Sequence, residues 1–154
     1  MTLLLGLVLG MSAGMRSMTP IAVVAWAAQL GWPDVRATSL AFMASPITAW
    51  AFTLFACTEL VLDKLPFTPS RLGAVPLGAR IVSGALCAAT VCAATHQPVA
   101  IGAIAGIVGA VTGALAGYHA RRHLTMNRKA PDLLVALAED AIAIGIAVLA
   151  VTRI

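Results

Sequence analysis

Charged residues are scarce in this sequence. Of its 154 residues, 10% are Asp, Glu, Lys or Arg, compared with about a quarter in a typical soluble domain. Because 60% of the residues are hydrophobic, the chain has too little polar surface to cover a water-soluble globule. The composition therefore excludes an ordinary soluble domain and indicates a membrane protein. In that setting the net charge of +4 fits a membrane surface better than nucleic acid.

Cysteine is scarce too. The chain has three cysteines, an odd number that leaves at least one thiol unpaired within a single chain. They lie inside apolar segments, at Cys57, Cys87 and Cys92. This placement is typical of small packing residues and excludes a disulfide framework.

Sequence signatures of a phosphate loop, a nucleophile elbow, CxxC or HExxH are absent. His119 and His123 have a spacing that can hold zinc, but Arg121 and Arg122 lie between them and repel a cation. We therefore predict no catalytic residue, no metal and no cofactor.

The chain does contain long apolar segments separated by short polar gaps. About five of them approach the ~20 residues that a helix needs to cross a bilayer. We predict an all-α fold, a polytopic transmembrane helical bundle that occupies residues 1–154 as a single domain. The expected spans cover about residues 2–30, 38–62, 79–95, 99–120 and 131–151.

The segment from Ala100 to Arg122 organises the chain, because its glycines recur three or four residues apart in an apolar run. In a soluble helix each glycine costs roughly 1 kcal/mol relative to alanine. In lipid the same residues let helix backbones approach closely. We predict helix-packing roles for Gly10, Gly14, Gly106, Gly109, Gly113 and Gly117.

The first segment, about residues 2–30, is too long for one upright helix. Pro20 removes a backbone donor and disfavours helix at Thr19. We expect a kinked or broken first helix whose second half runs over residues 21–30. In the second segment, Ser45-Pro46 is expected to produce a bend.

Two short stretches share the pattern GxxAG followed by polar residues, at residues 10–16 and 113–119. With two spans between them they would cross in opposite directions, as inverted repeats do in many transporters. The match is short and rich in Gly and Ala, so an inverted repeat and a chance match both stay open.

Basic residues accumulate in two of the expected loops. These loops hold Lys64, Arg71 and Arg80, and then Arg121, Arg122, Arg128 and Lys129. With five spans both loops lie on the same side, which the positive-inside rule makes cytoplasmic. We therefore expect a cytoplasmic N-terminus and a C-terminus on the opposite side.

Arg16 lies among apolar residues beside the expected helix break. An arginine in lipid costs at least a few kcal/mol, so it should face the protein interior or water. It is a candidate for binding an anion or a lipid headgroup, or for gating. The alternatives are a structural ion pair and snorkelling to the interface.

Four carboxylates are expected to gather towards one leaflet together with basic residues. Glu59 and Asp63 are one helical turn apart, and Glu139 and Asp140 lie inside the last segment. One interpretation is a cation or proton site, and the other is a network of interfacial salt bridges. The candidate substrate-binding or ion-binding residues are Arg16, Glu59, Asp63, Arg80, Glu139 and Asp140.

Four motifs carry a resemblance to a known family. They are Gly14-Met15-Arg16, Glu59-x-x-x-Asp63-Lys64-x-Pro66, Arg80-x-x-x-Gly84 and Glu139-Asp140. The chain resembles, over nearly its whole length, the small bacterial integral membrane proteins grouped as domain of unknown function 4126. The resemblance implies a polytopic helical protein of the bacterial inner membrane. In that membrane the C-terminus, which the loop charges put on the outside, would be periplasmic. It brings no established activity and no catalytic residues.

We predict a transporter or channel for a small ion or solute that uses intramembrane arginine and carboxylates. The alternative is a structural or lipid-binding membrane subunit without transport activity. A third hypothesis is a membrane enzyme that acts on lipid headgroups through Arg16 and the acidic residues. Because no nucleophile or metal motif supports it, we predict no enzyme. The expected partners are membrane lipids and further copies of the chain in a homo-oligomer, and not nucleic acid.

Overall fold

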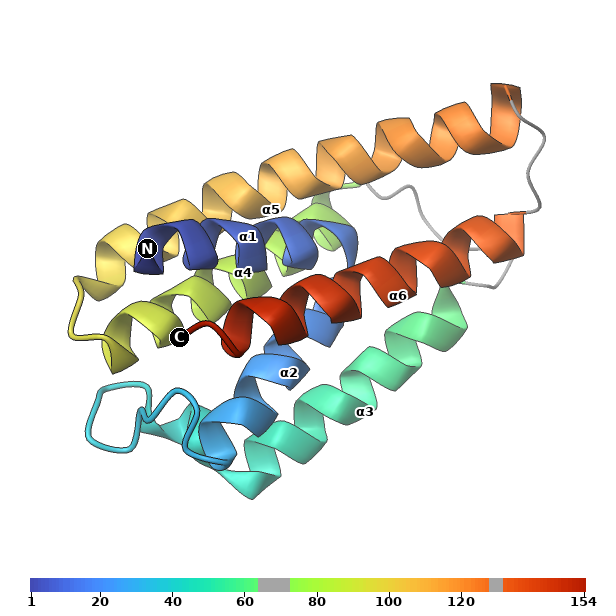
Figure 1. Cartoon of the computed structure of the whole chain (residues 1–154). Helices are drawn as coiled ribbons and strands as arrows, with labels where there is room; N and C mark the ends of the chain where they lie inside the picture. The colour runs from blue at the N-terminus through green and yellow to red at the C-terminus, as the bar shows by residue number, and fades with distance from the viewer. Residues whose placement is uncertain (64–72, 128–131) are drawn as a thin grey trace.

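The computed structural model describes residues 1–63, 73–127 and 132–154. Within these ranges the protein is helical without strands (Figure 1), which confirms the all-α fold class. The helices are α1 (Thr2–Met15), α2 (Met18–Gln29), α3 (Pro46–Leu62), α4 (Ala74–Ala94), α5 (Val99–Arg122) and α6 (Asp132–Val151). A 3₁₀ turn, η1 (Ala41–Ala44), precedes α3, and a π-helical turn, η2 (His123–Asn127), follows α5.

Three helical segments are long and apolar enough to cross a membrane. They are Ala74–Ala94, Val99–Thr125 and Leu134–Val151. The helices α1, α2 and α3 are apolar but shorter, with 14, 12 and 17 residues. The structure therefore supports a membrane protein, whereas the expected count of five spans is not confirmed.

The first apolar segment is two helices, and Pro20 explains why. In a continuous helix its ring would clash with the carbonyl group four residues earlier, at Arg16. Arg16 is instead extended, with φ −137° and ψ 122°, and α1 ends before it. The predicted break is confirmed, but α2 begins at Met18 rather than at residue 21. Thr19 is helical because Pro20 falls in the first turn, where proline is tolerated.

Pro46 begins α3 instead of bending a longer helix. The residue before it, Ser45, is extended with ψ 135°, as the proline ring requires. Residues 38–45 form turns and η1, so the expected span over 38–62 is too long. Conversely, α4 starts at Ala74 and not at 79, because Pro76 again occupies a first turn.

Glycines bring the backbones of α1, α4 and α5 together in what we call the glycine junction. A Cβ atom at Gly10 would collide with the carbonyl of Gly106, and one at Gly84 would lie 2.8 Å from the same oxygen. Such close approach lets helices pack without a hydrophobic driving force. Two further glycines of α5 lie close to the backbone of α1. A Cβ atom at Gly109 would collide with the Leu7 carbonyl, and one at Gly113 would collide with the Met11 carbonyl. Gly117 is buried further along α5.

The glycine contacts make α1 and α5 parallel. Gly10 faces Gly106, and Gly14 faces Ala110, so both helices advance in the same direction. The two GxxAG stretches therefore lie on parallel neighbours, and the expected inverted repeat is not confirmed. The reason is that α1 and α2 fold back on each other and add one change of direction before α3.

Both chain termini lie at the same end of the bundle (Figure 1). The helix α6 runs antiparallel to α1, because Ser12 contacts Ala143 and Arg16 contacts Asp140. The expectation that the termini lie on opposite sides is therefore not confirmed. The extra reversal between α1 and α2 is again the cause.

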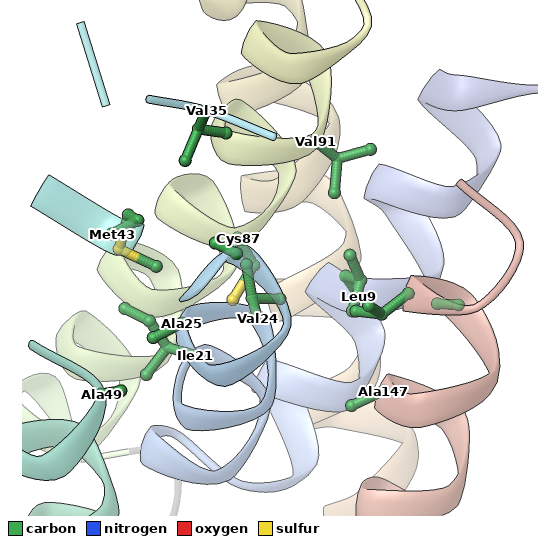
Figure 2. Packing of buried hydrophobic residues seen from close by; sticks show 13 residues of the cluster. Leu9, Ile21, Val24, Ala25, Val35, Met43, Ala49, Cys87, Val91 and Ala147 are labelled. Carbon is green, nitrogen blue, oxygen red and sulfur yellow. The ribbon is translucent and has the colours of Figure 1, made fainter. Parts of the chain in front are cut away.

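The apolar core is centred on α2. Leu9 of α1, Cys87 of α4 and Ala147 of α6 surround its buried face (Figure 2). The segment after α2 closes the core with Val35 and Met43, both fully buried. That segment turns at Gly31, whose φ of +86° favours glycine. With Ala49 of α3 also in it, the core joins α2 to four other helices, α1, α3, α4 and α6, and leaves the start of α2 beside the break at Arg16.

Candidate functional site

The site is built around the break between α1 and α2. Arg16 lies there with its side chain fully buried. Its guanidinium contacts two carboxylates from different helices: Nη1 donates to Asp63 Oδ2, and Nη2 pairs with Asp140 Oδ1. Burying a charge is costly unless it is paired with good geometry. The two ion pairs provide that compensation and connect the break to α3 and α6.

Glu59 caps the N-terminus of α2 from a neighbouring helix. The backbone N–H groups of Ser17 and Met18 donate to its Oε1 and Oε2, each over 2.8 Å. The first N–H groups of a helix have no partner within the helix, and the helix dipole favours a negative charge beside them. Glu59 therefore satisfies donors that the break exposes.

The periodicity of α3 places Glu59 and Asp63 together. Residues four apart on a helix share one face, and here that face lies against the helix break. We call Arg16, Glu59, Asp63 and Asp140 the Arg16 cluster. The structure thus brings together four of the six residues that the sequence indicated.

Glu139 and Asp140 are adjacent in α6, and adjacent helical residues do not face the same neighbour. Asp140 contacts Arg16, whereas Glu139 lies 3.8 Å from Arg121 of α5, measured from Oε2 to Nη1. The late Glu-Asp pair therefore connects α6 to α5 and to the break between α1 and α2, and it does not form one binding site.

Arg80 belongs to α4 and is 3% exposed. It borders a pocket of about 300 Å³ that we call the charged pocket. Residues of α2, α3 and α4 line it: Met18, Phe55, Glu59, Asp63, Pro76 and Arg80. Glu59 and Asp63 belong both to the Arg16 cluster and to this pocket, so a molecule in the pocket would meet charges of both signs.

Ser12 supports the site, although none of the sequence motifs indicated it. Its hydroxyl group donates to the Ala143 carbonyl of α6 over 2.8 Å, one helical turn from Arg16. A serine within a glycine-lined apolar helix is a signal for such an interhelical hydrogen bond. Lys64, Arg71, Arg128 and Lys129, which the loop-charge prediction used, lie outside the described residues.

A protein-family model described as Domain of unknown function (DUF4126) matches residues 3–153. The chain belongs to the DUF4126 family. The match confirms the resemblance seen in the sequence motifs. It extends across all the described helices, so it includes the whole Arg16 cluster. Neither a curated protein nor a solved structure matches the chain.

Proposed function

We propose that this DUF4126 protein is a multi-pass protein of the bacterial inner membrane that transports a small ion or solute. One observation carries the proposal: the buried Arg16 cluster shares Glu59 and Asp63 with a pocket beside a broken helix. Ionised residues within membranes are rare and tend to mark ion pathways. Broken helices occur where transporters bind their substrates.

The helix α3 is the element most suited to move. Its main packing contacts are with α2 and η1. Its C-terminal end is tied to the break through Asp63 and Glu59. A charged substrate that competes for either carboxylate would weaken these ties and release that end of α3. In this proposal the contacts of the Arg16 cluster keep the gate closed.

The orientation in the membrane follows from charge. Arg121 and Arg122, in the last turn of α5, lie at the end of the bundle opposite the termini. The positive-inside rule makes that end cytoplasmic. Both termini are then periplasmic, and the charged pocket lies towards the cytoplasmic leaflet.

Flux measurements on reconstituted protein test the proposal. Vesicles would report proton entry with an entrapped pH-sensitive dye, and Na⁺ and K⁺ flux with ion-sensitive dyes. Asp63→Asn should lower flux about tenfold, the effect of losing a charge interaction of about 1.4 kcal/mol. Arg36→Gln, in an exposed loop at the far end, is the control. Equal flux in wild type and empty vesicles for all three ions would reject ion transport.

A second candidate function is a structural or lipid-binding subunit. The specific observation in its favour is that Arg16 is sealed in direct ion pairs rather than facing open space. Under this reading Asp63→Asn lowers the free energy of unfolding and changes no flux. Measuring thermal unfolding and flux on the same preparations distinguishes the two functions.

A further inference from the structure

We propose that the ion that opens the Arg16 cluster is a proton, and that Asp63 takes it up from the charged pocket. The inference rests on the proposed function in one respect, namely that the cluster keeps a gate closed. Three observations carry it: the charge balance at Arg16, the position of Asp63 beside the pocket, and buried polar atoms near the break that have no hydrogen-bond partner among the described residues.

The charge balance at Arg16 leaves one excess negative charge. A single guanidinium pairs with two carboxylates, Asp63 and Asp140, from different helices. An uncompensated charge buried in a membrane protein is costly. Binding one proton removes that charge. It also leaves the guanidinium paired with the carboxylate that stays ionised.

The other described charges around the cluster come as two sets of opposite sign. Glu59 of α3 and Arg80 of α4 border the same pocket as Asp63. On the far side of α6, Glu139 lies 3.8 Å from Arg121 of α5. Each set contributes one positive and one negative charge. Neither set therefore changes the excess at Arg16.

Asp63 is the carboxylate of Arg16 that borders the pocket. Its side chain is 16% exposed and lines the pocket, whereas Asp140 does not line it. Arg16 bonds to Oδ2 of Asp63, so a hydronium ion in the pocket can transfer its proton to the other oxygen, Oδ1, and leave as water. The neutral acid then loses the charge that strengthens its bond to Arg16. Asp140 keeps the guanidinium compensated while the end of α3 is released.

Two buried polar groups beside the break indicate water at the site. Arg16 Nε lies in the break, and the Thr19 hydroxyl group lies in the first turn of α2. Both are buried, and neither has a hydrogen-bond partner within residues 1–63, 73–127 and 132–154. Buried donors of this kind are usually satisfied by ordered water. Water bonded to them would carry protons between the pocket and the Arg16 cluster.

The oxygen atoms at the pocket suit a proton better than a metal cation. A metal cation takes several oxygen ligands at once, but both oxygens of Glu59 accept backbone N–H groups and Oδ2 of Asp63 accepts from Arg16. In the described part of the chain, no group of three or more His, Cys, Asp or Glu residues is placed to hold a metal ion. A proton requires a single oxygen.

Electron paramagnetic resonance of the reconstituted full chain tests the inference at the end of α3. A nitroxide label on Val61→Cys, in a Cys57→Ser background, reports the mobility of that end, and Val61 is exposed. From about pH 8 to about pH 5 the ratio of mobile to immobile label should rise about tenfold. A label on Leu54→Cys is the matched control. It should not respond, because the Trp26 indole bonds to Thr53 and holds that part of α3.

Substitutions assign the acid response to Asp63. In Asp63→Asn the label at position 61 should be mobile at both pH values, whereas Asp63→Glu should keep the response. Asp140→Asn removes the excess negative charge at Arg16, so the response should become smaller. The inference is wrong if the label with Asp63 intact does not respond to pH, or if Asp63→Asn responds as strongly.

Flux measurements separate this inference from the proposed function. In the vesicles described above, proton flux without Na⁺ or K⁺ flux is expected. Flux of Na⁺ or K⁺ with no acid response of the label would reject the proton and keep ion transport. An acid response of the label without flux of any ion would reject transport and keep Asp63 as the proton-binding residue.

Discussion

The glycine junction and the Arg16 cluster hold the same helix, α1, by opposite means. Along its length α1 packs through Gly10 and Gly14 against the backbone of α5, without a charged group. At its C-terminal end it is held by a fully buried guanidinium and carboxylates from α3 and α6. The stability of the glycine junction is a sum of many small dispersion interactions, whereas that of the Arg16 cluster depends on a few strong charge interactions.

This difference teaches where the protein tolerates change. Close backbone packing loses stability gradually as volume is added at one position. A buried ion pair instead leaves an uncompensated charge when one partner is removed. We therefore expect the glycine junction to contribute to stability, and the Arg16 cluster to contribute to both stability and function. Three substitutions test this contrast.

The largest effect is expected from Arg16→Met. Removing the guanidinium leaves the buried Asp140 and the partly buried Asp63 without their partner, which should lower the free energy of unfolding by about 3–5 kcal/mol. Denaturant titration of the detergent-solubilised protein measures this. Adding Asp63→Asn and Asp140→Asn to the Arg16 variant should recover part of the loss. A loss below about 1 kcal/mol would mean that the pairs contribute no more than surface salt bridges.

A smaller effect is expected at the glycine junction from Gly106→Ala. The new Cβ would collide with the carbonyl of Gly84, so helix separation must increase at a cost of about 1–3 kcal/mol. Gly78→Ala is the control, because a Cβ there meets no atom within 4 Å among the described residues. That control should gain about 0.5–1 kcal/mol from helix propensity. Equal thermal shifts in the two variants would show that backbone contact does not limit packing here.

The smallest effect is expected from Ser12→Ala. It removes one hydrogen bond between α1 and α6, worth about 0.6 kcal/mol for such bonds in membrane proteins. Thr112→Ala is the control, since Thr112 bonds to carbonyls of its own helix. The difference between the two unfolding midpoints gives the interhelical contribution. A larger loss than that of Arg16→Met would reverse the proposed ranking of the two regions.

Much of the local structure could be predicted from the sequence. The helical class, the starts of α5 and α6 near residues 99 and 131, and a break near Pro20 depend on residues close together in the chain. The boundaries that were wrong, at Thr19, Pro46 and Ala74, all involve proline. A proline signal is compatible with a helix start as well as with a helix interruption, and only packing decides between them.

The candidate residues were also visible in the sequence, but their partners were not. A buried arginine and several carboxylates in apolar segments predict ion pairs without saying which pairs form. Arg16 and Asp63 are 47 positions apart, and their meeting depends on how α3 lies against the break. The two neighbours Glu139 and Asp140 look like one unit in the sequence, although they contact different helices.

By itself the sequence determined an apolar helical protein with glycine-lined faces, a break forced by proline, and a few charges that need compensation. These follow from composition and from steric effects within a few residues. Only the tertiary structure decided that α1 runs parallel to α5, that both termini share one end, and that Arg16 bridges α3 and α6. The physical reason is that contacts between distant segments depend on the direction in which each helix returns. One reversal, between α1 and α2, changes that direction for every later pairing.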